Sequence, residues 1–250
     1  MSTRMLAVSQ RAFGGPQVLE IIETERPEPG PHEVLVRIKA AGVNPADWKI
    51  RSGQIRRLGQ PPFTLGLDLS GVVEAVGEAV TRLRAAAGGI GHLAVQIAKA
   101  RGAYVIGTAR ADKHAFLHRL GADELIDYTR ADFATVARDI DVVLDPIAED
   151  YGPRSLDTLA PGGILIDVRG AGPDRSDVRK LADERGLRFV EFGFTPSTAD
   201  LEAIAGLVRQ GALRAAVETV LPLAQAARAH ELSETGRVKG KIVLTVNEAV

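Results

Sequence analysis

The chain has 250 residues, which corresponds to one large domain or two small ones. Lys and Arg total 31 against 32 Asp and Glu, so the chain lacks the basic excess of general nucleic-acid binders, and we expect no nucleic-acid partner. It contains no cysteine, which excludes disulfides, thiolate metal ligands and cysteine nucleophiles. No apolar stretch approaches the ~20 residues of a membrane-spanning helix, so we expect a cytoplasmic protein without membrane contact.

The first third of the sequence predicts short strands separated by turns. Turn signals with glycine and proline separate the apolar runs Met5–Ser9, Leu19–Glu23, Glu33–Ala40 and Leu69–Val76. Between the last two runs, Asn44 and Pro45 predict the cap and first residue of a helix that Ser52-Gly53 ends. This region is therefore expected to form a small β-rich domain.

From Ala85 onward, predicted strands and helices alternate. Strands are expected at Ala103–Thr108, Glu124–Asp127, Asp141–Asp145, Gly163–Val168 and Arg188–Phe194, and helices at Gly91–Arg101, Asp112–Leu120, Phe133–Arg138, Val178–Arg185 and Thr198–Gln210. Such alternation predicts a doubly wound parallel sheet, the Rossmann type of α/β fold. The apolar runs Val142-Val143-Leu144 and Ile164-Leu165-Ile166 predict strands buried on both faces. The tail predicts a helix at Ala224–Ser233 and a strand at Lys241–Val246.

A glycine-rich loop precedes the first of these helices. Residues 86–91 read Ala-Ala-Gly-Gly-Ile-Gly, a variant of the dinucleotide fingerprint, in which Gly88, Gly89 and Ile90 let the backbone approach a pyrophosphate at the helix N-terminus. The alternative is a tight turn in which glycine serves packing only. The six residues before Ala85 include two arginines and make a poor central strand, so the usual first strand is missing near Arg84–Ala85.

Two basic residues follow the next predicted strand. Thr108, Arg110 and Lys113 stand where an NAD-dependent enzyme places a carboxylate on the ribose, and a guanidinium and an ammonium suit the 2′-phosphate of NADPH. The alternative is that Arg110 and Lys113 are solvated residues at a helix start. Asp112 is interpreted as a helix cap.

At these residues the chain resembles the zinc-independent quinone oxidoreductase (zeta-crystallin-like) branch of the medium-chain dehydrogenase/reductase superfamily. The resemblance rests on the segments 40–53, 66–73, 85–98, 120–123, 159–163 and 236–244. It implies a partial GroES-like catalytic domain over residues 1–84, a Rossmann domain over 85–220, and a segment, 221–250, that returns to the first domain. Relatives carry several dozen residues between the matches to Val80 and Ala85, so either the sequence omits residues or the protein has an internal deletion.

The resemblance also implies a function and site residues. It implies hydride transfer from NADPH to a quinone or an α,β-unsaturated carbonyl compound, by a homodimer paired through the edge strand near Arg188–Phe194. Asn44 is expected beside the nicotinamide ribose or the substrate carbonyl, with a helix-cap role as the alternative. Asp47 is expected to orient that region, with a local turn or ion-pair role as the alternative. Tyr128 is expected near the adenine, with a tyrosine that simply ends a strand as the alternative, and Phe194 and Lys241 are expected near the cofactor.

Metal binding is not expected. Zinc-dependent members of the superfamily have a cysteine where this chain has Asn44 and a histidine where it has Leu67. His114 and His118 have helical spacing but no third ligand close in sequence. Two alternatives to a reductase remain open at this point: a non-catalytic NADPH-binding regulator or sensor, and an inactive deletion form of the same fold.

Overall fold

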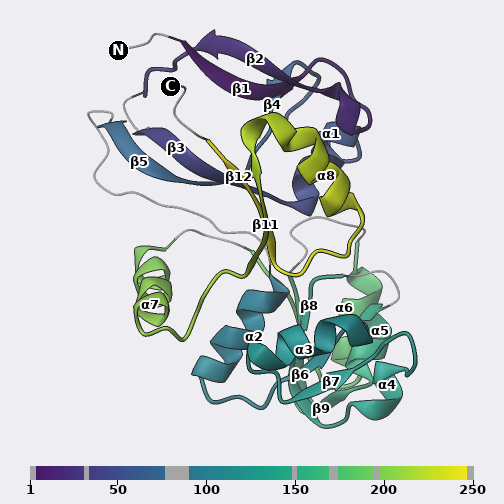
Figure 1. Cartoon of the computed structure of the whole chain (residues 1–250). Helices are drawn as coiled ribbons and strands as arrows, with labels where there is room; N and C mark the ends of the chain where they lie inside the picture. The colour runs from purple at the N-terminus through teal and green to yellow at the C-terminus, as the bar shows by residue number, and fades with distance from the viewer. Residues whose placement is uncertain are drawn as a thin grey trace. The chain divides into compact units, whose positions relative to one another are not determined.

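The computed structural model describes residues 4–30, 34–76, 90–147, 151–168, 174–193 and 197–246. It divides into two compact units, one formed by Met1–Gly89 with Ala215–Val250 and the other by Ile90–Arg214 (Figure 1). The segment from Ala215 onward therefore belongs with the N-terminal unit. We call these unit 1 and unit 2 and describe each by itself.

Unit 1 is built on two small sheets with the strand orders β2-β1-β4 and β11-β12-β3-β5. Its strands and helices are β1 (Arg4–Gln10), β2 (Leu19–Glu25), β3 (Val34–Val43), α1 (Pro45–Ser52), β4 (Phe63–Thr64), β5 (Asp68–Val76), β11 (Val217–Pro222), α8 (Ala226–Glu234) and β12 (Lys241–Thr245), with 3-10 turns at Pro16–Val18 and Leu223–Gln225. The predicted β-rich domain and the predicted α1 are confirmed. Gly53 ends α1 with φ +84°, a left-handed conformation that glycine adopts without strain.

The C-terminal strand is central to this unit. β12 pairs antiparallel with β3 and parallel with β11, so the last part of the chain completes the sheet begun by the first part. Val43, Ile242 and Leu244 pack with α8 in one apolar core, and α8 lies beside α1 (Figure 1). β11 was not predicted from the sequence.

A buried arginine joins α1 to α8. The Arg51 guanidinium donates to the carbonyl oxygen of Gly14 at 3.0 Å and to the Nδ1 of His230 at 3.2 Å, and it pairs with Glu234. Burial lowers the pKa of His230 from 6.5 to about 4; the Arg51 charge lowers it further and Glu234 opposes the change. His230 is therefore neutral at neutral pH and accepts from the arginine.

Unit 2 has the parallel strands and alternating helices that the sequence predicts. They are α2 (Gly91–Ala100), β6 (Ile106–Thr108), α3 (Ala111–Arg119), β7 (Glu124–Ile126), α4 (Phe133–Val136), β8 (Ile140–Asp145), α5 (Tyr151–Leu156), β9 (Leu159–Asp167), α6 (Ser176–Glu184), β10 (Arg188–Glu191) and α7 (Thr198–Arg209). α5 was not predicted, and β6 is shorter than expected. β9 is the middle strand of the sheet β10-β9-β8, and its Leu165 is fully buried, as its apolar sequence predicts.

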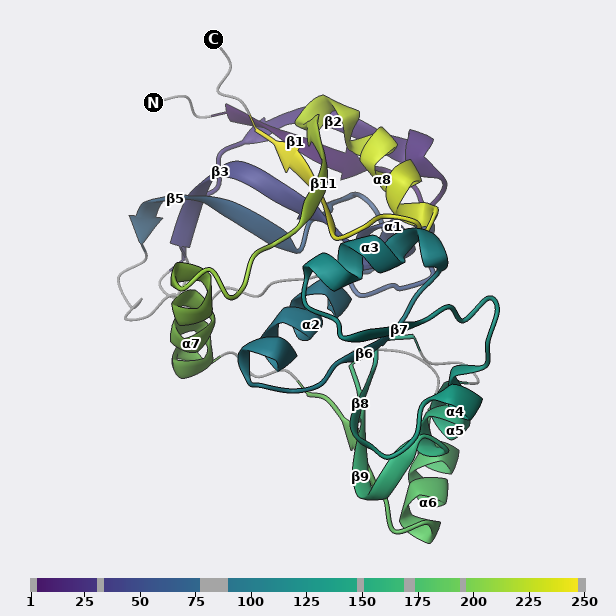
Figure 2. The same cartoon turned by 60° about the horizontal axis from the view of Figure 1, so that its bottom comes forward.

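The parallel strands of unit 2 form two separate pieces. β6 pairs with β7 and β8 with β9, but within the described ranges no strand joins β6 to β8 (Figure 2). The prediction that β8 is buried on both faces is wrong, because Val142 is 54% and Leu144 37% exposed.

Candidate active site and cofactor residues

Asn44 lies where β3 ends and α1 begins. Its side-chain amide accepts at Oδ1 from the Nζ of Lys241 at 2.7 Å and donates through Nδ2 to the Oδ2 of Asp68 at 2.9 Å. The side chain is buried, yet its second amide N–H has no partner among the described residues. Asn44 therefore offers one unused hydrogen-bond donor in a fixed place.

Three neighbouring strands assemble this group. β12 and β5 flank β3 on its two sides, so Lys241 at the start of β12 and Asp68 at the start of β5 meet beside the end of β3. The Lys241 Nζ is 2.9 Å from the Asp68 Oδ2, and the two side chains are 12% and 17% exposed. Asp68 was not among the predicted site residues, and Lys241 was expected beside the cofactor. No local signal in the sequence links either residue to Asn44.

Gly42 makes room for the Asp68 carboxylate. The two residues are directly opposite in the β3–β5 register, and a Cβ on Gly42 would lie 3.0 Å from the Asp68 Oδ2 and 3.1 Å from its Cβ. A larger residue would therefore displace the carboxylate. This requirement explains one glycine of the segment 40–53.

Asp47 stabilises the backbone of Asn44. Its Oδ2 accepts from the Asn44 backbone N–H at 2.7 Å, the reciprocal half of a helix capping box. Its side chain is 2% exposed, and Oδ1 has no hydrogen-bond partner among the described residues. Burial raises the pKa of the Asp47 carboxyl from 3.8 to about 6; Asp68 raises it further, while the Asn44 N–H and Lys241 oppose the rise. Asp47 thus contacts Asn44 through the Asn44 backbone.

The predicted residues of the adenosine end gather in unit 2 at one edge of the β6–β7 pair. Thr108 pairs with Ile126, and since the strands are parallel, Arg110 and Tyr128 leave the two strands at the same edge. Thr108, Arg110 and Tyr128 are exposed, and Lys113 is half-buried in the first turn of α3. A guanidinium, an ammonium and an aromatic ring at one edge fit a phosphorylated adenosine.

The start of α3 differs from the prediction. The N-cap position belongs to Arg110, and Asp112 lies inside the first turn, so Asp112 is not the cap. Asp127 directly follows β7, and hydrogen bonds from the hydroxyl and the backbone N–H of Thr129 hold the pKa of its carboxyl below the usual range. This carboxylate comes from the neighbouring strand and so escapes a reading of local spacing.

The remaining cofactor residues divide between described and undescribed parts of the chain. Gly88, Gly89 and Phe194 lie outside the described residues, as does the predicted break at Arg84–Ala85. Ile90 is exposed at the N-cap position of α2, and a Cβ on Gly91 would meet nothing within 4 Å. Among the described residues, nothing covers the N-terminal end of α2, where a helix can bind a phosphate.

No group of three metal-ligating side chains occurs among the residues that the structure describes. His114 and His118 each bond a backbone carbonyl oxygen at 2.9 Å, those of Ala109 and Ala122. Leu67 is exposed. None of the described helices is long and apolar enough to cross a membrane.

A buried ionic group that the sequence did not reveal lies at the ends of β8 and β9. Asp145 and Asp167 are paired in register as the last residues of these strands. The Arg175 guanidinium lies 2.8 Å from Asp145 and 3.6 Å from Asp167, and all three side chains are buried. The arginine thus ties the two strand ends to the start of α6.

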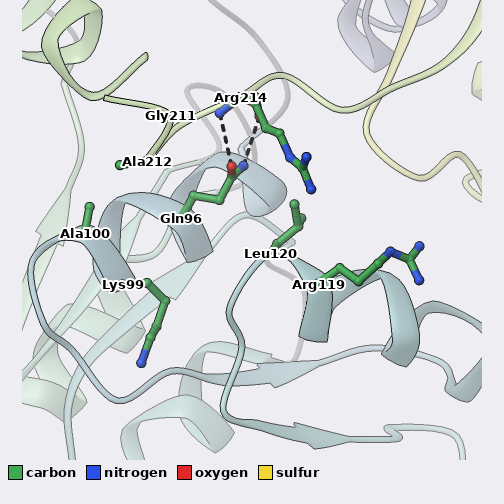
Figure 3. A pocket seen from close by; sticks show the side chains of 8 residues that line it. All are labelled: Gln96, Lys99, Ala100, Arg119, Leu120, Gly211, Ala212 and Arg214. Carbon is green, nitrogen blue, oxygen red and sulfur yellow. Dashed lines mark hydrogen bonds between the residues drawn. The ribbon is translucent and has the colours of Figure 1, made fainter. Parts of the chain in front are cut away.

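An open hollow of about 400 Å³ lies elsewhere in unit 2 (Figure 3). Gln96 lines it, and the Gln96 carboxamide forms two hydrogen bonds with the backbone of Arg214, at 3.0 and 3.1 Å. Lys99, Arg119 and Leu120 also line it, but none of the predicted site residues does. The carboxamide fixes the turn after α7 against α2.

Comparison with known proteins agrees with the resemblance. The model of the alcohol dehydrogenase GroES-like domain matches residues 30–88, and that of the zinc-binding dehydrogenases matches 120–244. A quinone oxidoreductase of Pseudomonas aeruginosa is 31% identical over 316 aligned residues, which cover 93% of this chain and 97% of the relative. The chain belongs to the medium-chain dehydrogenase/reductase family. Within this family it is of the quinone oxidoreductase type.

Two further relatives extend this comparison. A 2-haloacrylate reductase of Burkholderia is 27% identical, covering 92% of this chain and 96% of the relative. The structure of the quinone oxidoreductase of Coxiella burnetii has a TM-score of 0.87 and 27% identity, and covers 98% of this chain and 100% of that one. The alignment with the Pseudomonas relative has 316 positions although this family member has 250 residues, so dozens of the relative's residues have no counterpart here.

Proposed function

We propose that this protein is a zinc-independent reductase that transfers hydride from NADPH to a quinone or an α,β-unsaturated carbonyl compound. The observation that carries the proposal is the Asn44 amide, held on two sides with one N–H unused. A fixed donor of this kind stabilises the negative charge that develops on a carbonyl oxygen during reduction. The names of the two curated relatives, a quinone and a haloacrylate reductase, support this substrate class.

The residues at the β6–β7 edge favour NADPH over NADH. Arg110 and Lys113 would hold the 2′-phosphate, Tyr128 would lie near the adenine, and the open N-terminus of α2 would take the pyrophosphate. The cofactor supplies the hydride when it is bound. Unit 1 supplies the donor to the carbonyl: the Asn44 N–H bonds the oxygen, and Asp47 holds the Asn44 backbone in place.

Zinc independence is part of the proposal. An amide at position 44 and an aliphatic side chain at position 67 are not zinc ligands of the usual type. The Asn44 amide oxygen is moreover occupied by the Lys241 ammonium, whose positive charge opposes a metal ion there. Charge stabilisation at the carbonyl is therefore assigned to the amide.

We also propose a homodimer that pairs through β10. This strand ends the sheet β10-β9-β8, and Val190 on it and Phe192 just after it are exposed. Light scattering on the purified protein tests the assembly, and a monomeric mass would contradict it.

The test is turnover by the purified protein. NADPH oxidation is followed with 1,4-benzoquinone and, separately, with an α,β-unsaturated ketone. Asn44→Ala should lower kcat by about 100- to 1,000-fold, the usual effect of removing one such donor. Gln54→Ala, which removes an exposed amide of the same unit, is the matched control and should leave kcat unchanged. An unchanged kcat in Asn44→Ala would contradict the proposal.

One observation favours a second candidate, an inactive form of the same fold. Val142 and Leu144 on β8 are exposed, and among the described residues no strand other than β9 pairs with β8. NADPH binding by calorimetry without any turnover would favour a binding protein, and non-cooperative unfolding would favour the inactive form.

A further inference from the structure

The orientation of the Asn44 amide is decided by its two neighbours. A lysine ammonium only donates hydrogen bonds, whereas a carboxylate only accepts them. The amide oxygen must therefore face Lys241, at 2.7 Å, and the amide nitrogen must face Asp68, at 2.9 Å. Rotating the amide by half a turn would place nitrogen against ammonium and oxygen against carboxylate, two repulsive contacts in place of two hydrogen bonds.

The Lys241–Asp68 pair is well placed to keep this orientation. Water reaches little of either side chain, so the pair is screened less than the exposed ion pairs of the surface. Its two residues come from β12 and β5, which do not pair with each other, and the contact spans the end of β3 where Asn44 lies. Gly42 leaves the space in which the carboxylate lies over the strand.

We propose that Asp68 and Lys241 are positioning residues that hold the Asn44 amide in one of its two orientations, so that its unused N–H always faces the reactant. The inference rests on the proposed function for the identity of the reactant, but not for the orientation itself. The alternative role is purely structural, in which the ion pair only ties β12 and β5 together. The two roles differ in what happens when the charges exchange places.

Exchanging the charges separates these roles. The double variant Asp68→Lys with Lys241→Asp keeps an ion pair across β3 but reverses which neighbour donates, so the amide should rotate. We expect kcat for 1,4-benzoquinone to fall about as far as in Asn44→Ala, 100-fold or more, with KM for NADPH little changed. The matched control, Arg11→Glu with Glu20→Arg, exchanges an exposed ion pair of the same unit. Wild-type kcat in the Asp68/Lys241 exchange would overturn the proposal.

A second measurement does not need turnover. The sequence contains two asparagines, Asn44 and Asn247, so protein labelled at asparagine gives two pairs of side-chain amide signals by proton–nitrogen NMR, and Asn44→Ala assigns them. One Asn44 proton faces a carboxylate and the other has no partner among the described residues, so their shifts should be widely separated. In Asp68→Leu with Lys241→Met the separation should collapse toward that of a solvated amide. An unchanged separation would overturn the proposal even if the charge exchange fails to fold.

The two experiments also separate this inference from the proposed function. If Asn44→Ala retains full activity, the function assigned to the amide fails while the NMR result still decides the orientation. If Asn44→Ala is inactive but the charge exchange is active, the function stands and the positioning role is wrong.

Discussion

Replacing Asp47 by asparagine should make unit 1 less sensitive to pH. In the folded protein burial raises the pKa of this carboxyl from 3.8 to about 6, so the folded state binds the proton more tightly than the unfolded state. The contribution of Asp47 to stability is therefore fully present below pH 3.8 and is lost as the pH rises to about 6. Above that pH, the folded protein carries a buried charge.

The size of the effect follows from the pKa change. Each pKa unit corresponds to about 1.4 kcal/mol of free energy. A rise from 3.8 to about 6 thus removes about 3 kcal/mol of unfolding free energy between acid and neutral pH. A side-chain amide at this position carries no charge, so Asp47→Asn should gain about 3 kcal/mol relative to wild type over this range. If the new amide N–H changes the unfolding free energy by an amount that does not depend on pH, that amount cancels when the two proteins are compared across the pH range.

The assay uses the single tryptophan of the chain. Trp48 neighbours Asp47 on α1, so its fluorescence reports the unfolding of unit 1. Urea unfolding of both proteins at several pH values from about 4 to about 7.5 gives the difference directly. If the wild-type and variant free energies run parallel over this range, Asp47 does not change its pKa on folding and the reasoning is refuted.

Three further predictions concern the cofactor, a histidine and zinc. Arg110→Ala should weaken NADPH binding about tenfold to a hundredfold and leave NADH binding unchanged, since a charged hydrogen bond contributes about 1.5–3 kcal/mol. Calorimetric titration of both cofactors tests this, with Arg119→Ala as the control variant. Equal losses of affinity for NADH and NADPH would show that Arg110 supports the fold instead. The preference should shrink as salt rises, because Arg110 is exposed. Burial lowers the pKa of His230 from 6.5 to about 4, so the stabilising effect of His230 is present above pH 6.5 and is lost as the pH falls to about 4. Over that range the unfolding free energy of wild type, measured by Trp48 fluorescence, should fall by up to about 3 kcal/mol relative to that of His230→Gln. A difference in unfolding free energy that does not change with pH would contradict this prediction. Elemental analysis after dialysis against a chelator should find no stoichiometric zinc. One zinc per chain would contradict the proposal that the protein is zinc-independent.

The sequence by itself determined the elements and much of the fold. The helices predicted at 112–120 and 198–210 match α3 and α7 to within a residue or two. Pro45 and Gly53 marked the two ends of α1, because these residues restrict or free the backbone wherever they stand. The family segments identified the GroES-like and Rossmann parts. Basic residues after β6 led to the hypothesis of a cofactor site there, since they lie within a few positions of one another.

Only the tertiary structure decided which side chains lie next to one another. Asp68 and Lys241 stand 173 positions apart, and they meet because β12 pairs with β3 and β3 with β5. Asp145, Asp167 and Arg175 meet at neighbouring strand ends in the same way. Val142 and Leu144 have the sequence of a buried strand, yet they are exposed, because burial depends on whether a neighbouring strand lies beside them. Local sequence sets backbone conformation, but strand pairing over long separations sets which side chains share a site.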